Sequence, residues 1–166
     1  MKIHQTSRDS LEQQMGKIAG VIGSEGFPTG ERAALRRMIP DHPLPLSFYR
    51  FAFSYLPTAW EYTINEWVTL VAGIALMSPN AYSPRVGFGK ALAEAGYSEY
   101  RLERLLAARY GIRLTLFLRA VRFLAAKSKP FNWAEGARFL FTKSEDKLEM
   151  LNLRIAGDFY SKIERE

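Results

Sequence analysis

Hydrophobic residues recur along this chain with the period of an α-helix. In residues 7–23 the apolar positions come three or four residues apart, at Leu11, Met15, Ile18, Ala19 and Ile22. Residues at this spacing lie on one face of a helix. No segment shows sustained alternation with a period of two, and no Asn-Gly or Asp-Gly hairpin signal occurs. The pattern therefore predicts an all-α fold.

The same pattern predicts about eight helices, packed as one or two small helical bundles. Prolines and glycines separate them. The predicted helices cover residues 7–23, 29–38, 46–56, 58–77, 88–95 and 112–127, and others begin after Ser98, Asn132 and Ser144. A proline-containing loop at 78–84 suggests a division into an N-terminal bundle, 1–84, and a C-terminal bundle, 85–166.

Several helix ends are predicted from individual residues. Thr29 is expected to cap the second helix, and Pro57 with Thr58 to begin the fourth. Gly96 is expected to end the helix that precedes it. Gly111 is expected to interrupt a helix, and Asn132 with Glu135 three residues later resembles a capping box.

Aromatic residues are concentrated in residues 46–77, and this segment has two interpretations. Exposed aromatic rings can stack on nucleic-acid bases. A helical spacing, however, is more typical of a buried core face. That spacing is present at Trp60, Ile64, Trp67, Val68, Val71 and Ala75. We therefore expect these six side chains to form core.

Composition excludes several kinds of site. The chain has no cysteine, which removes disulfides and thiolate ligands. The two histidines, His4 and His42, lack ligand partners at helical spacing, so no metal or other cofactor is expected. We find no secretory signal, and the longest apolar run, 68–77, is too short to span a bilayer. A cytoplasmic protein without membrane contact is expected.

Positive charge is concentrated in one part of the chain. Residues 85–143 contain twelve Lys/Arg against four Asp/Glu, whereas the whole chain has a net charge of +6. Arginines outnumber lysines there by eight to four, and the planar guanidinium suits bidentate contact with phosphate. A charged run is often only a solvated face. The local excess on successive helices, with Arg101, Arg104 and Arg109 available to solvent and Arg113 and Arg122 flanking an apolar arc, favours a polyanion-binding surface.

Known catalytic motifs are missing from the sequence. The segment Gly87-Phe88-Gly89-Lys90 suggests a phosphate loop, but Ala91 follows the lysine where a Walker motif needs Ser or Thr. Glu99 and Glu103 are more simply surface residues one helical turn apart than a catalytic pair. We therefore expect no enzymatic activity.

The ordered motifs resemble those of the CasB family, the small subunit of the type I-E CRISPR Cascade complex. They are GERAALRR at 30–37, GKALAEAG at 89–96, Arg101, Leu105-Leu106 with Ala108-Arg109, Leu118-Arg119 and Asn132-Trp133. The resemblance implies an all-helical subunit without nuclease activity that pairs head to tail with a second copy. It also implies contacts with the guide-RNA-coating subunits, the large subunit, the crRNA and both strands of the target DNA in the R-loop.

Candidate nucleic-acid-binding residues follow from the motifs and from helical facing. The motifs carry over six positions: Arg36, Arg37, Lys90, Arg101, Arg109 and Arg119. Charge and facing add Arg122, Arg138 and Lys143. Two alternatives stay open at this point. The basic face could dock acidic protein surfaces in a structural scaffold, or the chain could be a small helical enzyme that uses the Tyr and Arg residues of a pocket. A deep cleft lined by a carboxylate of strongly shifted pKa would support the enzyme.

Overall fold

The computed structural model describes residues 6–164, with side chains described from residue 11 to residue 161. The elements are α1 (Thr6–Gly23), α2 (Thr29–Arg36), α3 (Leu46–Tyr55), the 3-10 helix η1 (Trp60–Thr63), α4 (Ile64–Met77), α5 (Phe88–Ala95), α6 (Glu99–Ala107), α7 (Tyr110–Ala126), α8 (Trp133–Phe141) and α9 (Glu145–Glu164). Within this range the only β-type pairing is an isolated bridge between Tyr82 and Phe131. The all-α prediction is confirmed.

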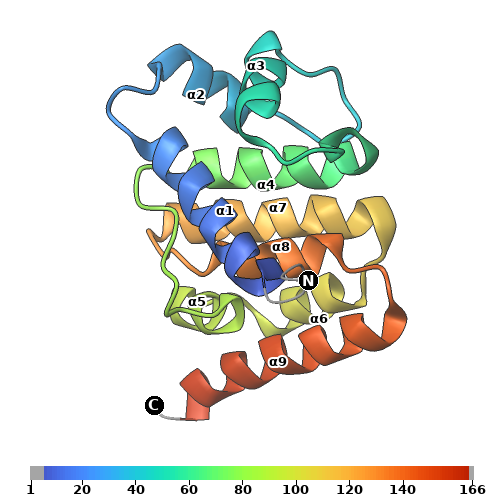
Figure 1. Ribbon diagram of the computed structural model, residues 1–166. Helices are drawn as coiled ribbons and strands as arrows, with labels where there is room; N and C mark the ends of the chain where they lie inside the picture. The colour runs from blue at the N-terminus through green and yellow to red at the C-terminus, as the bar shows by residue number, and fades with distance from the viewer. Residues whose placement is uncertain (1–5, 165–166) are drawn as a thin grey trace.

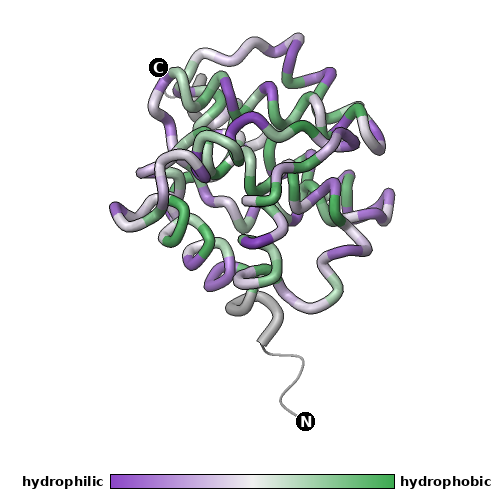
Figure 2. The backbone as a smooth tube through the Cα atoms, turned by 90° about the horizontal axis from the view of Figure 1, so that it is seen from above, coloured by the Kyte–Doolittle hydropathy of each residue, from purple (hydrophilic) through white to green (hydrophobic). Residues whose placement is uncertain are grey.

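The helices form a stack around α4 and α7, which lie side by side in the middle of the molecule (Figure 1). α2 and α3 cover one side of this pair, α5, α6 and α9 lie on the other, and α1 crosses the stack. Seen from above, apolar and polar residues follow one another closely along the helices, as amphipathic helices require (Figure 2). No described helix is long and apolar enough to span a membrane.

The core is continuous across the loop at 78–84. α4 on one side of this loop packs against α7 on the other, and α1 packs against α8. A single cluster of buried apolar residues includes side chains from both halves, from Met15 to Phe159. The division into two bundles at residue 84 stays a prediction.

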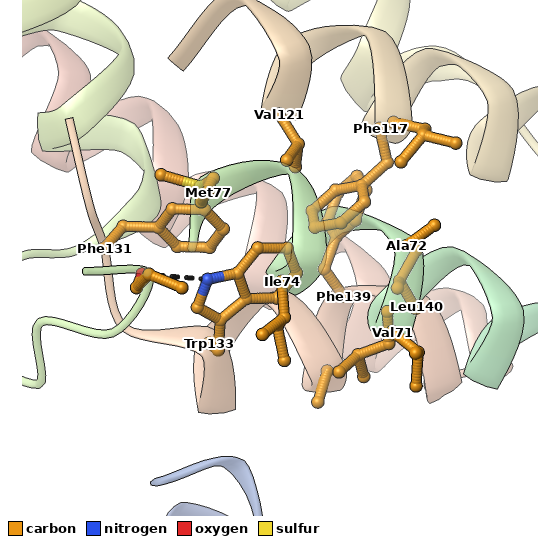
Figure 3. Packing of buried hydrophobic residues seen from close by; sticks show 14 of the residues in the cluster. Val71, Ala72, Ile74, Met77, Phe117, Val121, Phe131, Trp133, Phe139 and Leu140 are labelled. Atoms are coloured by element: carbon orange, nitrogen blue, oxygen red, sulfur yellow. Dashed lines mark hydrogen bonds between the residues drawn. The ribbon is translucent and has the colours of Figure 1, made fainter. Parts of the chain in front are cut away.

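Trp133 is the central side chain of this cluster (Figure 3). Its ring is fully buried, and its Nε1 donates a hydrogen bond to the Ala81 carbonyl at 3.0 Å. Phe117 and Phe131 contact it with ring centroids 5.9 and 4.6 Å away. Gly73 in α4 leaves room for it, since a Cβ there would lie 2.5 Å from the indole Cη2. The expected core face of residues 60–75 is confirmed, with five of its six side chains buried and Ile64 half-buried.

Gly89 allows α5 and α9 to touch through their backbones. A Cβ at this position would overlap the Ile155 carbonyl oxygen and lie 2.9 Å from its carbonyl carbon and 3.1 Å from the Phe159 nitrogen. Side chains cannot relieve such an overlap, because the obstacle is the α9 backbone itself. Gly89, the second glycine of the segment Gly87-Phe88-Gly89-Lys90, therefore serves helix packing.

One predicted helix cap and one predicted helix start are wrong. α2 begins at Thr29 after Pro28, so Thr29 is its first helical residue and not its cap. The helix predicted from residue 58 is replaced by η1, and α4 begins only at Ile64. Here Ala59 adopts a left-handed conformation, φ 72°, which turns the chain so that Trp60 packs against Phe48 at a centroid distance of 5.8 Å.

Other helix ends are partly as predicted. Gly96 ends α5 in the left-handed region, φ 83°, and the Ser98 side chain accepts a hydrogen bond from the Arg101 amide, so both predictions are confirmed. The break near Gly111 falls earlier, at the extended residues Ala108 and Arg109. Gly111 itself lies in the first turn of α7.

The capping box at Asn132 is half formed. The Asn132 side chain accepts a hydrogen bond from the Ala134 amide at 2.9 Å, but the Asn132 amide donates to the Val86 carbonyl. Glu135 instead accepts a hydrogen bond from the Phe88 amide at the start of α5, 3.3 Å away. Burial raises the pKa of the Glu135 carboxyl, and Asp158 raises it further, while Arg154 opposes the rise.

Gly89→Ala should destabilise the protein by about 1–3 kcal/mol, because the added methyl group forces α5 and α9 apart. Gly157→Ala is the matched control: this exposed glycine lies within α9 with nothing within 4 Å of an added Cβ, and alanine should stabilise the helix by up to about 1 kcal/mol. Urea unfolding of both variants measures the difference. A neutral effect at position 89 would contradict the close approach.

Glu135→Gln should stabilise the protein at neutral pH more than at acidic pH. A carboxyl whose pKa is raised on folding stabilises the folded state at low pH, and that contribution is lost as pH rises through the folded pKa. Glutamine keeps the acceptor for the Phe88 amide without the charge. The melting temperature of the variant relative to the parent should rise by about 1–3 °C between about pH 4 and about pH 7. A pH-independent difference would contradict the raised pKa.

Candidate nucleic-acid interface

The most concentrated group of arginines lies between α6 and α7. Arg101 and Arg104 from α6 and Arg119 from α7 line a hollow of about 320 Å³ with Tyr97 and Leu116. We call it the arginine hollow. None of the three arginines forms an ion pair with a described acidic side chain, and all three are exposed. Their charges are therefore available to a ligand.

The local sequence explains this arrangement. Gly96 ends α5, and Ser98 caps α6 two residues later. Positions 101 and 104 then share one side of α6, because residues three apart are neighbours on a helix. On α7, Leu118 and Val121 are buried on the opposite face from Arg119, which directs the arginine outward.

Aromatic rings support the guanidinium groups. The Arg101 guanidinium lies 5.7 Å from the centroid of Phe123 and 5.9 Å from that of Tyr97, and Arg104 lies 5.9 Å from that of Tyr100. Such cation–π contacts restrict the side chains and leave the N–H groups free at the edge. Lys127 adds a further cation 5.8 Å from the Phe123 ring.

The hollow contains no negative charge at neutral pH. Burial raises the pKa of the Tyr97 phenol, although Arg101 and Arg104 act in the opposite direction. Tyr97 therefore stays neutral, and the charged groups of the hollow are all positive. An anion with oxygen acceptors, such as a phosphate diester, matches this lining.

Arg109 has a different environment from the arginine hollow. Its Nη1 donates to the carbonyls of Leu106, Ala107 and Ala108 at 3.2, 3.3 and 3.0 Å. Its Nε and Nη2 lie 3.3 and 3.2 Å from the carboxylate of Glu145. Arg109 thus satisfies the C-terminal carbonyls of α6 and ties them to α9, so these donors are already engaged within the chain.

Arg113 was expected beside the apolar face of its helix, but it is 4% exposed. Its guanidinium lies 3.5 Å from the centroid of Phe139, and its Nε donates to the Phe139 carbonyl at 3.1 Å. Burial, and secondarily Arg109, lowers the pKa of Arg113 to about 10, so it stays charged at neutral pH. Its position beside the apolar face does not leave it at the surface, because packing between α7 and α8 covers it.

The other candidates do not line the arginine hollow. Arg36 donates from Nε to the Ala75 carbonyl at 2.8 Å, Arg138 lies 3.6 Å from Glu12, and Lys143 lies 2.9 Å from Glu66. Arg37, Lys90 and Arg122 are exposed, with no ion pair to a described acidic side chain. Nucleic-acid contact by each candidate stays a prediction.

The structure adds residues that were not selected from the motifs. Arg104 completes the hollow, and Lys127 borders it through Phe123. Arg104 could have been found from the sequence, because a residue three positions after Arg101 lies beside it on the same side of a helix. Among the described residues no group of His, Asp and Glu could hold a metal ion, and His4 lies outside the described range.

Arg109→Ala should lower the free energy of unfolding by about 1–2 kcal/mol, since three carbonyls and a carboxylate lose a partner. Part of this contact is exposed to solvent, which limits the loss. Arg119→Ala is the matched control and should change stability by less than about 0.5 kcal/mol. Denaturant unfolding measures both. Equal effects would contradict the structural role of Arg109.

Comparison with known proteins identifies a family. No curated protein matches the chain. The family described as CRISPR-associated protein Cse2 matches residues 31–160, which include α3 to α8 and the whole arginine hollow. This match covers well over half of the chain and agrees with the resemblance seen in its motifs. The chain therefore belongs to the Cse2 family, also called CasB, the small subunit of the type I-E CRISPR Cascade complex.

Proposed function

We propose that this Cascade small subunit is non-catalytic and holds the nucleic-acid backbone of the R-loop, including the displaced strand, through the arginine hollow. The observation that carries the proposal is the convergence of Arg101, Arg104 and Arg119 on one hollow without an acidic residue. Guanidinium groups supply paired N–H donors that fit phosphate oxygens. Such contacts read no base sequence, so the guide RNA supplies specificity by base pairing.

Modest contacts suffice for this role. Forming an RNA–DNA heteroduplex in place of a DNA duplex is a nearly balanced exchange. A few charge-assisted hydrogen bonds to the strands can therefore shift it, since each contributes about 1.5–3 kcal/mol. Arg122 lies one turn beyond Arg119 on α7, and Lys127 is the C-cap residue of this helix; both can extend the contact along a strand.

The family match supports a proposal for the wider assembly. We propose that the subunit pairs head to tail with a second copy, and that it contacts the crRNA-coating subunits and the large subunit. Arg36, Arg37, Lys90, Arg138 and Lys143 lie outside the hollow and are proposed as secondary backbone contacts. Arg36, Arg138 and Lys143 already have partners within the chain and would have to release them before binding a phosphate.

The test is a salt series with labelled single- and double-stranded DNA and RNA. The slope of log affinity against log salt counts the phosphates neutralised. For the variant Arg101→Gln/Arg104→Gln/Arg119→Gln we expect the magnitude of this slope to fall by about 2–3. The matched control, Lys17→Gln/Arg50→Gln/Lys147→Gln, removes three exposed positive charges elsewhere. It should keep most of the slope.

The same variants should then be tested in assembled Cascade. We expect the hollow variant to form the R-loop at least about tenfold less readily than the control, with the subunit still incorporated. R-loop formation equal to that of the control would contradict backbone binding at the hollow. Loss of incorporation with unchanged nucleic-acid binding would instead favour a protein-docking role for the basic face.

A further inference from the structure

α6 carries opposite charges on two of its sides. Arg101 and Arg104 face α7 and line the arginine hollow. Glu99 and Glu103, one turn apart, line a second hollow of about 600 Å³ between α6 and α9. We call this second hollow the α6–α9 groove. Because one short helix separates the two surfaces, a nucleic-acid strand held on one side is repelled from the other.

The groove combines apolar walls with an acidic rim. From α6, Leu102 lies between the two glutamates in sequence and Leu106 lies one turn further on. α9 contributes Glu149 and Tyr160. More apolar than polar surface lines it, while Glu99, Glu103 and Glu149 are all exposed. An apolar groove with charged edges is the usual receptor for an amphipathic helix.

The negative charge of the groove is not balanced within the described side chains. None of Glu99, Glu103 and Glu149 forms an ion pair there, and Arg109, which also lines the groove, is engaged with Glu145. Carboxylates one turn apart on a helix repel each other. A cation placed between them relieves this repulsion, so the groove favours a positively charged occupant.

Asn152 links the two helices that form the groove. Asn152 donates from Nδ2 to the Leu106 carbonyl at 3.1 Å, which ties α9 to α6. Its Oδ1 is buried and accepts no hydrogen bond from a described residue.

The basic helix α2 of a second copy is a poor candidate for the occupant. In α2, Arg32 donates to the carbonyls of Ile22 and Ser24, and Arg36 donates to the Ala75 carbonyl. These bonds hold the helix in its own fold and leave Arg37 as the exposed guanidinium without such a bond. One free cation does not match three carboxylates.

We infer that the α6–α9 groove is a docking site for a basic amphipathic helix of another protein subunit of the complex. The apolar side of that helix packs against Leu102 and Leu106, and its lysines or arginines meet Glu99, Glu103 and Glu149. The inference does not depend on nucleic-acid binding by the arginine hollow. α6 then acts as a divider, with nucleic acid on its α7 side and protein on its α9 side.

The first experiment compares incorporation into reconstituted Cascade. The variant Glu99→Gln/Glu103→Gln/Glu149→Gln keeps the shape of the groove and removes its charge. We expect its half-saturation concentration to rise at least about tenfold, because three charge pairs are lost. The matched control, Glu25→Gln/Glu61→Gln/Asp146→Asn, neutralises three exposed acids outside the groove and should incorporate like the parent. Incorporation of the groove variant equal to that of the control would overturn the inference.

Three further measurements identify the cause. Thermal unfolding shows whether the groove variant keeps its fold, and a glutamine variant with parental stability that still fails to incorporate supports docking. Salt-dependent DNA binding by the free chain should be unchanged or tighter, which separates this inference from the function of the arginine hollow. A fall in self-association that accounts for the lost incorporation, measured by sedimentation, would assign the groove to a second copy and overturn the inference.

A photo-crosslinking amino acid at Ala107, an exposed position of the groove, tests the occupant directly. In reconstituted Cascade it should crosslink to a helical segment of another subunit that carries several lysines or arginines. Crosslinking to nucleic acid, or to a second copy of this chain, would overturn the assignment.

Discussion

The packing of Trp133 against Gly73 is the contact on which the rest of the structure depends. It brings α8 against α4, which are more than fifty residues apart in sequence, with no side chain between them on the α4 side. The indole N–H donates to the carbonyl of Ala81, which lies in the loop at 78–84 that follows α4. The core therefore fixes both the helix pair and the path of the chain between them, and α7 packs along α4 with Phe117 against the Trp133 ring.

Two buried charged residues then determine how the outer helices attach. Arg113 reaches under α8 to bond with the Phe139 carbonyl, and it also lies 3.4 Å from the carbonyl of Ala108. Glu135 holds the first amide of α5. Each residue meets a helix end, where backbone groups lack partners within the helix. The orientations of α5 and α6, and hence the direction of the arginines on α6, rest on these buried contacts.

The sequence predicted the helices and the buried faces well, because a 3.6-residue spacing of apolar residues can be recognised without knowing which helix packs against them. It also placed the positive charge in residues 85–143. It could not distinguish Arg113 from Arg122, since both flank the apolar arc of α7 and only the packing of α8 covers one of them. Likewise, nothing near Glu135 in sequence indicates that its partner is Phe88, 47 residues earlier. The left-handed Ala59 was missed for a similar reason, because the burial of Trp60 determines it.

The division of charge on α6 has a consequence for how the chain can vary. Each residue added to a helix rotates everything after it by about 100°. An insertion early in α6 would turn Arg101 and Arg104 away from α7 and would also displace Glu103 and Leu106 relative to α9. Substitutions can change either surface independently, but a change in helix length alters both at once. Among related sequences the length from Ser98 to Ala108 should therefore be far more constant than the identity of the residues within it.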